Sequence, residues 1–341
     1  MYLDTKEIVT IIISTFLFSF IITPFIKKIA FHIKSVDKPN KRRINKIPMP
    51  TLGGLVIFLT FIFGYMVFAS KIIDMIPIIL GGIIILITGM IDDLNPIKAK
   101  YKFIGQFIAA IIVVLYGGLV IEKVDAFGIY IDFGMFDQLI SIIFILGMIN
   151  AVNFIDGLDG LATGISEIFF ITIAIISFVS GKYNGLDIYL TLIMLGTTLG
   201  FLIHNFYPAK IYLGDSGAML LGYIVSIIAI LGFKSVTLTS FVVPLFIMAI
   251  PILDTAWAIL RRIINKKSIM TADKMHLHHR LLSLNISHRN TVLLIYLMNS
   301  LFALSSIIYA VIDKKIGIVL YIILFIVFVI IVYKIGHKTK K

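Results

Sequence analysis

The chain has 341 residues, of which 60% are hydrophobic and 14% are charged, and its formal net charge at pH 7 is +12. A soluble domain is nearer half apolar and a quarter charged, and the apolar excess here falls in blocks long enough to cross a bilayer. A pair of soluble domains is therefore excluded. The lack of cysteine also excludes disulfides, thiolate metal sites and cysteine nucleophiles.

Eleven apolar spans follow one another along the chain, each of a length that suits a membrane-crossing helix. They are expected at 8–31, 52–69, 75–91, 103–121, 136–152, 163–180, 187–206, 217–233, 236–260, 292–312 and 316–335. We therefore expect an all-α polytopic membrane protein with about 11 transmembrane helices, organised as one domain over residues 1–341. The N-terminal segment lacks a basic region, so we expect no cleaved signal peptide. Residues 125–134 alternate around a central glycine and predict a small hairpin outside the membrane.

The distribution of Lys and Arg predicts the orientation of these spans, because cytoplasmic loops carry the excess of positive charge. With the N-terminus outside, 23 of the 30 Lys and Arg residues fall on the cytoplasmic side and seven fall outside. We therefore expect the N-terminus outside and the C-terminus in the cytoplasm. In this orientation the polar motifs considered below all lie on the cytoplasmic face, whereas the outer loops carry no comparable cluster.

The first acidic motif is IDDLNP, in which Asp92 and Asp93 close the third span. Adjacent aspartates do not share one helix face, so we expect the pair at a helix end. The pair is either a site for a metal ion or metal-bound phosphate, or two solvated acids that end the span. Lys100 and Lys102 lie beside the pair in the following segment, and Gln106 lies about one turn into the next span.

The second motif, NFIDGLDGLA, places Asn153, Asp156 and Asp159 three residues apart in apolar surroundings. In a helix these side chains would lie roughly along one face. Gly157 and Gly160 would allow a ligand or another backbone to approach closely. The spacing does not fit an EF-hand, because the third and fifth positions from Asp156 carry no oxygen ligand. Ionisable groups beside a membrane core are costly, which favours a functional site over simple helix capping.

The third motif, YLGDSG, places Asp215 at a predicted helix start, where it is either a functional carboxylate or an N-cap. Tyr212 offers an aromatic face on which a base could stack, or it packs in the interfacial aromatic belt. A basic loop, KPNKRRINKIPMPTLGG, precedes the second span. This loop either anchors the chain on the cytoplasmic side or captures an anionic substrate or lipid, and Lys46 is its candidate contact.

The fourth motif, HLHHR, contains His276, His278, His279 and Arg280. Zinc is disfavoured, because no cysteine and no HExxH pattern accompany these histidines. Imidazoles and a guanidinium suit a phosphate site beside a hard cation, and the alternative is a basic loop next to the membrane. Carboxylates together with substrate phosphates are the usual way in which proteins bind Mg²⁺. The four motifs together therefore predict phosphoryl transfer to or from a membrane lipid.

These motifs resemble those of the polyprenyl-phosphate N-acetylhexosamine-1-phosphate transferases, the MraY/WecA/TagO family. PMPTLGG, DDLNP with KYKFIGQ, NAVNFIDGLDGLA, YLGDSGAMLLG and HLHHRL follow one another in the family's order between about Lys38 and Ser287. The resemblance implies that GlcNAc-1-phosphate is transferred from UDP-GlcNAc to undecaprenyl phosphate, which releases UMP and forms the first lipid intermediate of a cell-surface polymer. It also implies a bacterial plasma membrane location, a cytoplasmic active site, dependence on Mg²⁺ or Mn²⁺, and inhibition by tunicamycin. No nucleic acid is implied as a partner.

The resemblance also implies roles for individual residues. Asp215 corresponds to a Mg²⁺ ligand, Tyr212 to an aromatic that stacks on uracil, and Asp159 to an acid in the uridine pocket. The Asp92–Asp93 pair corresponds to acids near the lipid phosphate. The candidate catalytic residues are Asp92, Asp93, Asp156, His276, His278 and His279, and the candidate substrate-binding residues are Asn153, Asp159, Tyr212, Arg280, Lys102 and Lys46.

Two alternatives stay open at this stage. Within the family, PTLGG resembles the phospho-MurNAc-pentapeptide transferases, whereas HLHHR has the form of the hexosamine branch. Asn45 and Thr51 also depart from that branch, where His and Arg are common. From another class, a cation-coupled transporter would carry intramembrane acids, but here the acids gather at one face and no inverted repeat is visible. The sequence is compatible with a homodimer and does not specify the polymer.

Overall fold

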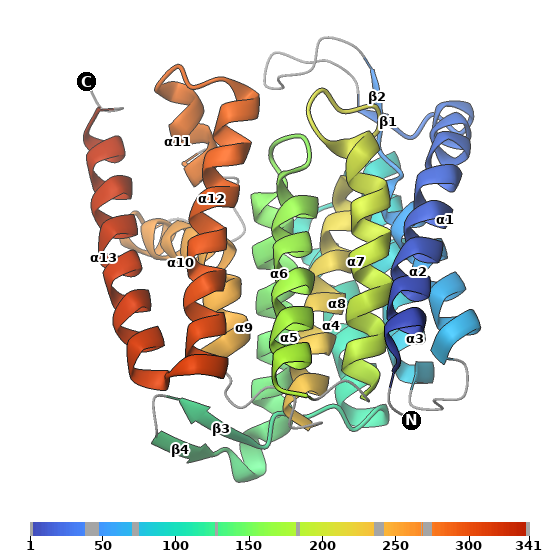
Figure 1. The fold of residues 1–341 in the computed structure, drawn as a ribbon. Coiled ribbons are helices and arrows are strands. Elements are labelled where there is room, and N and C mark those ends of the chain that lie inside the picture. The colour runs from blue at the N-terminus through green and yellow to red at the C-terminus, as the bar shows by residue number, and fades with distance from the viewer. Residues whose placement is uncertain are drawn as a thin grey trace.

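The apolar spans of the sequence form helices that run side by side, and α1 begins at the end of the bundle opposite to that at which α13 finishes (Figure 1). The structure is a computed structural model, and it describes residues 3–37, 48–69, 75–126, 129–181, 185–234, 242–266, 268 and 275–338. In chain order the α-helices are α1 (Thr5–His32), α2 (Gly53–Gly64), α3 (Met75–Leu94), α4 (Ala99–Ile111), α5 (Asp137–Ile155), α6 (Leu161–Val179), α7 (Leu186–Asn205), α8 (Gly214–Lys234), α9 (Val242–Ile247), α10 (Ala249–Ile264), α11 (Leu277–Ser283), α12 (His288–Ile307) and α13 (Lys314–Lys338).

Short elements extend or connect these helices. Helices α2, α4 and α12 continue into the π-helical turns η1 (Tyr65–Ala69), η2 (Ile112–Tyr116) and η4 (Ile308–Ile312), and the 3-10 turn η3 (Gly134–Phe136) precedes α5. The strands are β1 (Val36–Asp37), β2 (Met49–Pro50), β3 (Lys123–Ala126) and β4 (Ile129–Asp132). They form two antiparallel pairs, β1 with β2 and β3 with β4.

Within the described part of the chain, nine helices are long and apolar enough to cross a membrane, and Gly53–Ala69 forms a shorter apolar helix. Each of them coincides with one predicted span. The prediction of a polytopic helical membrane protein is therefore confirmed. The predicted number of eleven membrane-crossing helices is not confirmed, because the span expected at 236–260 is not one continuous helix.

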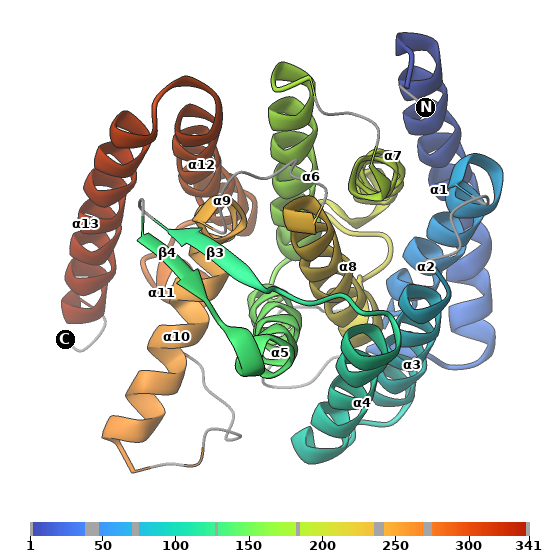
Figure 2. The ribbon, with the colours of Figure 1, turned by 90° about the horizontal axis from the view of Figure 1, so that it is seen from below.

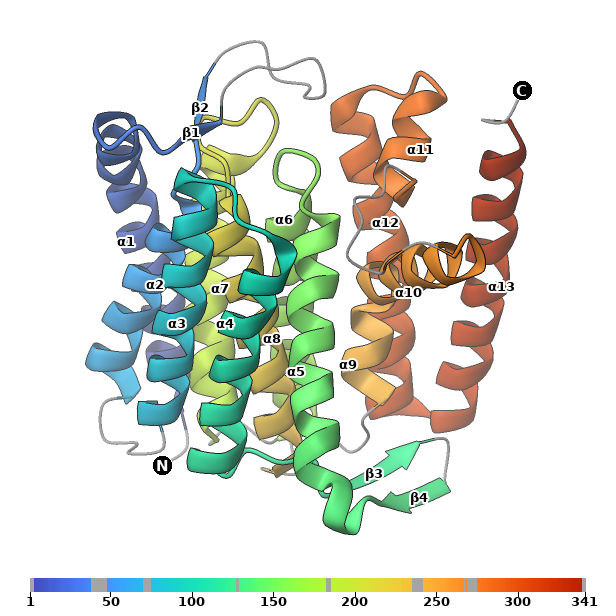
Figure 3. The same ribbon diagram turned by 180° about the vertical axis from the view of Figure 1, so that it is seen from behind.

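That span divides at Met248 into α9 and α10. Pro251 explains the division, because a proline cannot donate a backbone hydrogen bond to the carbonyl four residues earlier, here that of Ile247. Figure 3 shows α9 along the bundle and α10 lying across it. One set of α10 residues is apolar and exposed, including Trp257, whereas Asp254 is buried. The described part of the span expected at 236–260 is therefore a short buried helix followed by an amphipathic one.

Helix α8 forms the centre of the bundle, where α2, α3, α5 and α7 surround it (Figure 2). In its apolar window 83% of the residues are buried, compared with 11% in α13, which lies at the edge of the bundle. The close approach of α3 to the start of α8 depends on Gly89. A Cβ atom at this position would lie 2.2 Å from the Cα atom of Ser216. The two helix ends that carry acidic motifs are therefore held in direct contact.

The predicted hairpin is confirmed as β3 and β4, with Lys123 opposite Asp132 and Val124 opposite Ile131. Figure 2 shows the hairpin extending from α5 towards α13. Lys314, at the start of α13, donates a hydrogen bond of 2.9 Å to Asp125 Oδ2. The hairpin is therefore fastened to the end of the bundle that lies away from the polar motifs.

Candidate active site

The acidic motifs meet at one end of the bundle, where Lys102 joins two of them. Its Nζ atom lies 2.7 Å from Oδ2 of Asp92 and 3.2 Å from Oδ1 of Asp215. Asn153 Nδ2 donates to the same Oδ1 atom of Asp215 at 2.7 Å. The ends of α3 and α5 and the starts of α4 and α8 thus contribute to one cluster, and its members are separated by up to 123 positions in the sequence.

The two adjacent aspartates of IDDLNP have different partners. Asp92 accepts the N–H of Ile97 at 2.8 Å and faces the ammonium group of Lys102. Asp93 accepts the N–H of Asp215 at 2.8 Å, and its other oxygen accepts the N–H of Ser216 at 3.2 Å and its hydroxyl at 2.6 Å. A carboxylate in this position caps the first turn of a helix and interacts favourably with the helix dipole. Asp93 therefore fixes the start of α8 and with it Asp215.

The NFIDGLDGLA motif is not a continuous helix, so its three polar side chains do not share one helix face. Asn153 belongs to α5, Asp156 is the residue that ends it, and Asp159 lies in the loop before α6. Gly160 adopts φ +76°, a left-handed conformation that favours glycine and helps to break the helix. Burial raises the pKa of Asp156 well above its ordinary value, and the neighbouring carboxylates of Asp215, Asp93 and Asp159 add to this rise by repulsion.

Asp159 connects its loop to two other segments. Its Oδ2 atom accepts the N–H of Ala209 at 3.0 Å, and its own N–H donates to Nε2 of His288 at 2.9 Å. The ring of Tyr207 stacks on His288 with a centroid distance of 4.6 Å. Neither Tyr207 nor His288 was a candidate from the sequence, because neither lies within an acidic or histidine motif. Tyr207 is therefore an aromatic residue that contacts the Asp159 network through His288.

Tyr212 is held by its backbone next to the first loop. Its N–H donates to Pro50 at 2.8 Å, and its carbonyl accepts the N–H of Gly53 at 3.1 Å. The tyrosine itself is half-buried. These backbone hydrogen bonds hold Tyr212, the predicted base-stacking residue, three positions before Asp215. Its contact with uracil stays a prediction.

The histidine motif begins at the N-terminus of α11 and is anchored by Asp254 of α10. Nδ1 of His276 lies 2.8 Å from Oδ2 of Asp254, and the N–H of Leu277 donates to Oδ1 at 2.9 Å. Figure 3 shows α11 above α10. Asp254 was not a candidate from the sequence, because it lies within an apolar block that predicts a membrane span. A lone acid in a predicted span was the only signal that could have identified it.

His278 is directed at the NFIDGLDGLA loop. A Cβ atom on Gly157 would lie 2.1 Å from Nε2 of His278, so glycine is required there for the ring to fit. The ring of His276 stacks in parallel at a centroid distance of 5.9 Å, and that of His279 lies at 4.2 Å. Burial lowers the pKa of His278 well below its ordinary value, and the neighbouring histidines lower it further. Among the described residues both ring nitrogens of this 2% exposed side chain have no hydrogen-bond partner.

Arg280 has a different environment from the one its predicted role requires. Nε donates to the carbonyl of Met275 at 3.0 Å, and a terminal nitrogen donates to the carbonyl of Val332 in α13 at 3.4 Å. The residue is 8% exposed. These bonds favour a role in holding α11 against α13. Its contact with a sugar stays a prediction that these bonds do not support.

The remaining residues that the sequence singled out do not join the acidic cluster or the histidine segment in the described structure. Lys46 and Asn45 lie outside the described residues. Thr51 is buried, and its hydroxyl lies 3.2 Å from that of Ser35, so it helps to close the β1–β2 pair. Gln106 donates to Met219 Sδ and accepts from Asn150, which links α4 to α8 and α5 within the bundle.

The oxygen atoms of the cluster fit the requirements of Mg²⁺. Among the described residues, no group of three or more His, Cys, Asp and Glu side chains is spaced to hold a metal ion by itself. Mg²⁺ is usually bound by one or two carboxylates that are completed by water and substrate phosphates. Asp215 and Asp92 supply two such carboxylates, and Lys102 balances part of their charge. The donor set therefore suits a hard cation that arrives with a phosphate ligand.

Comparison with known proteins agrees with the arrangement of motifs. The profile of glycosyl transferase family 4 matches residues 75–233. The chain is 41% identical, over 96% of its length and 90% of the relative's, to a probable undecaprenyl-phosphate N-acetylglucosaminyl 1-phosphate transferase of Bacillus subtilis. It is 30% identical to a decaprenyl-phosphate N-acetylglucosaminephosphotransferase of Mycolicibacterium smegmatis, over 86% and 79% of the two chains. A phospho-N-acetylmuramoyl-pentapeptide-transferase of Halalkalibacterium halodurans is 29% identical over 80% and 89%.

Proposed function

The chain belongs to glycosyl transferase family 4, and on this basis we propose that it transfers GlcNAc-1-phosphate from UDP-GlcNAc to undecaprenyl phosphate. The products are UMP and undecaprenyl-diphospho-GlcNAc. Similarity is greater to the relative named for N-acetylglucosaminyl 1-phosphate transfer, at 41% identity, than to the pentapeptide transferase, at 29%. This difference favours the hexosamine branch over phospho-MurNAc-pentapeptide transfer.

The cluster of Asp92, Lys102 and Asp215 is the observation that carries the proposal. It combines carboxylate oxygens for a hard cation with an ammonium group for a phosphate, within distances of 2.7 Å and 3.2 Å. Such a pairing suits phosphoryl transfer, in which a protein contributes mainly positioning and charge neutralisation. A cation-coupled transporter does not require an ammonium group beside these carboxylates or a histidine segment next to them.

Chemically, an oxygen of the lipid phosphate attacks the phosphorus that carries the sugar. The bond between that phosphorus and the oxygen bridging to the uridine phosphate breaks, and UMP leaves with the electron pair. A phosphomonoester has a second pKa near about 6, so the lipid phosphate is already largely dianionic at neutral pH. A general base therefore has little to contribute, and we favour direct attack over a covalent aspartyl-phosphate intermediate.

The residues divide this work between them. Asp215, with Asp92 beside it, would hold Mg²⁺ or Mn²⁺, and the bound ion would neutralise charge on the pyrophosphate. Lys102 provides a second positive charge next to the same oxygens. Asp93 keeps Asp215 in place through the first turn of α8. Asn153 fixes Oδ1 of Asp215 from the opposite side.

The histidine segment lies on the other side of the NFIDGLDGLA loop, where its histidines would contact a phosphate. His278 lies against Gly157, and its buried ring nitrogens have no hydrogen-bond partner among the described residues. Asp159, with Tyr207 and His288 next to it, borders the uridine pocket. Tyr212 stacks on uracil.

In the cell we expect the active site to face the cytoplasm of a bacterium, with the N-terminus outside. The charge distribution supports this orientation. The lipid product would be the first intermediate of a surface polymer such as teichoic acid or O-antigen, and tunicamycin would inhibit its formation.

Purified protein tests the proposal directly. With undecaprenyl phosphate and Mg²⁺, UDP-GlcNAc should yield UMP and a lipid-linked sugar in equal amounts, whereas UDP-MurNAc-pentapeptide should yield neither. Product from UDP-MurNAc-pentapeptide alone would assign the chain to the other branch. Failure of both donors, together with cation flux in proteoliposomes, would favour the transporter.

A further inference from the structure

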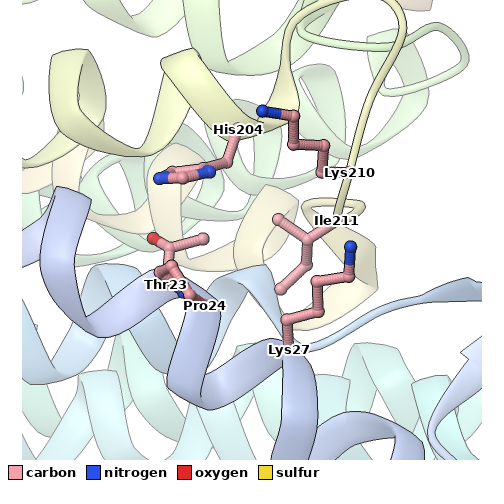
Figure 4. A pocket seen from close by; sticks show the side chains of 6 residues that line it. All are labelled: Thr23, Pro24, Lys27, His204, Lys210 and Ile211. Atoms are coloured by element: carbon pink, nitrogen blue, oxygen red, sulfur yellow. The ribbon is translucent and has the colours of Figure 1, made fainter.

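A cavity of about 230 Å³ lies between α1 and the segment that joins α7 to α8. Its lining consists of Thr23, Pro24, Lys27, His204, Lys210 and Ile211. Figure 4 shows Lys27 on α1 and Lys210 on the α7–α8 segment, with the side chain of Ile211 between them and their ammonium groups apart. A cavity needs only about 10–15 Å³ to hold one water molecule, so this one has room for a larger polar group.

The cavity is positively charged without a balancing acid. Neither Lys27 nor Lys210 forms an ion pair with any residue that the structure describes. His204 is occupied differently, because its Nε2 atom lies 3.1 Å from the carbonyl oxygen of Phe20 and its ring stacks on that side chain at 4.9 Å. Both lysines line the same cavity, so an anion bound there would lie near two positive charges.

The position of the cavity indicates which kind of anion would bind there. It lies on α1 near the end of the bundle that carries the acidic site, where a membrane-crossing helix reaches the headgroup level. The surface next to it is apolar and exposed, with Ile21 at 57%, Phe25 at 59% and Ile203 at 51%. Basic pockets between transmembrane helices on the cytoplasmic side are suited to anionic lipid headgroups. A phosphate in the cavity could therefore continue into acyl chains along α1 and α7.

We propose that this cavity binds the phosphate headgroup of an anionic phospholipid from the cytoplasmic leaflet, held between Lys27 and Lys210. The site is separate from the acidic cluster, because none of its lining residues belongs to that cluster or to the histidine segment. It goes beyond the transfer reaction, since the bound lipid is neither donor nor acceptor.

The segment that carries Lys210 also reaches the active site. Lys210 donates its N–H to the carbonyl of His204 at 2.8 Å, and Asn205 donates to the carbonyl of Ile211 at 3.0 Å. The residue before Lys210, Ala209, donates its N–H to Asp159 at 3.0 Å. A headgroup that binds Lys210 would therefore restrain the segment that positions Asp159 and leads into α8. Anionic lipid should stabilise this region as well as occupy the cavity.

Lipid binding by the whole protein tests the proposal without requiring turnover. Protein in nanodiscs of phosphatidylcholine with and without phosphatidylglycerol is compared by thermal unfolding, and retained lipid is counted by native mass spectrometry. The wild type should unfold at a higher temperature with phosphatidylglycerol and retain one molecule of it. The Lys27→Gln/Lys210→Gln variant should bind this lipid roughly 25-fold more weakly, if each lysine contributes about fivefold near an anionic headgroup.

Matched variants separate this site from general surface charge. Lys28→Gln removes the neighbouring lysine of α1, which does not line the cavity, and should behave as the wild type does. Lys27→Arg/Lys210→Arg keeps both charges and should restore binding if the double glutamine variant folds poorly. An equal response of the glutamine variant and the wild type to phosphatidylglycerol would overturn the proposal.

Two further arms distinguish the source of the phosphate. Inorganic phosphate and glycerol phosphate, added to phosphatidylcholine nanodiscs, should give no comparable stabilisation. If either soluble anion stabilises the wild type as much as the lipid does, the cavity is a site for free phosphate compounds. If the glutamine variant has a raised KM for undecaprenyl phosphate and an unchanged response to phosphatidylglycerol, the cavity serves the acceptor lipid, and the proposal fails.

Discussion

Asp254 of α10 and His276 of the histidine motif form a buried pair, with Nδ1 of the imidazole 2.8 Å from Oδ2 of the carboxylate. The other carboxylate oxygen accepts the N–H of Leu277 and so caps α11. One acid therefore sets both the orientation of the first histidine and the start of the helix that carries His278. Because α10 branches away from the bundle axis, this pair joins the histidine segment to the rest of the fold.

The first prediction follows from this pair. Asp254→Ala should lower kcat/KM at least about 5-fold, because a buried partner left without its hydrogen bond costs about 1–3 kcal/mol and the histidine segment loses its position. Asp254→Asn keeps an acceptor for Leu277 and should lose less thermal stability than Asp254→Ala. Kinetics with UDP-GlcNAc and thermal unfolding in detergent measure the two effects separately.

Asp132→Asn is the control for this experiment, since Asp132 forms an exposed ion pair with Lys123 at 3.4 Å on the hairpin. Such surface pairs contribute about 0–1 kcal/mol, so this variant should resemble the wild type. A fully active Asp254→Ala protein would show that the histidine segment needs no anchor on α10.

The second prediction concerns the metal ion. Asp215→Asn should reduce turnover at least about 10²-fold, the scale observed when one preorganised charge-stabilising group is removed. EDTA should abolish the activity of the wild type, and Mg²⁺ or Mn²⁺ should restore it. Titration of activity against Mg²⁺ checks the assignment, and near-normal turnover of Asp215→Asn with an unchanged Mg²⁺ requirement would place the ion elsewhere.

The sequence was sufficient to predict the polytopic helical fold and the family, because apolar blocks and short polar motifs are local features. It also predicted that the acidic motifs gather at one end, since the positive-inside rule assigns their loops to one side. It did not distinguish Asp92 from Asp93. Their roles differ only because Gly89 brings α3 against the start of α8, and this contact joins positions far apart in the chain.

Tertiary contacts explain the remaining differences between the sequence predictions and the structure. Asp254 lies within an apolar block, so its pairing with His276 becomes visible only when α10 is seen to leave the bundle after Pro251. The three-residue spacing in NFIDGLDGLA suggested a shared helix face, but its glycines end α5 and place Asp159 in a loop. The spacing therefore misjudged the backbone on which these three residues lie.

The third prediction concerns pH. The pKa of His278 is lowered in the folded protein by burial and by the adjacent histidines, whereas in the unfolded chain it returns to its ordinary value of 6.5. Between these two pKa values the unfolded state binds more protons than the folded state. The contribution of His278 to the free energy of unfolding is therefore full above pH 6.5 and decreases as the pH falls below it. The melting temperature of the wild type should therefore decrease on acidification below this pH.

The variant His278→Gln separates this contribution from other titrating groups. It removes the ionisable ring and should show a smaller decrease in melting temperature over the same pH interval, although its stability at neutral pH is lower. Equal pH dependence in the variant and the wild type would mean that His278 titrates similarly in both states of the protein. Thermal unfolding at a series of pH values in one detergent provides the comparison.

The last prediction decides between two roles of Arg280. If Arg280 recognises the sugar, Arg280→Lys should raise KM for UDP-GlcNAc and leave stability unchanged, because lysine cannot reproduce the planar fork of donors. The structure instead directs two of its nitrogens to the carbonyls of Met275 and Val332. Loss of one hydrogen bond from a charged group costs about 1.5–3 kcal/mol. We therefore expect Arg280→Lys to lower the melting temperature and to change KM less than twofold.

Arg289→Lys provides a matched control, because Arg289 lies near the start of α12 and outside both the site and the α11–α13 contact. It should change neither KM nor the melting temperature. A raised KM for UDP-GlcNAc with an unchanged melting temperature in Arg280→Lys would return this residue to the sugar site. In that case the N–H groups that do not bond to Met275 or Val332 would serve the sugar, because a guanidinium carries five such donors.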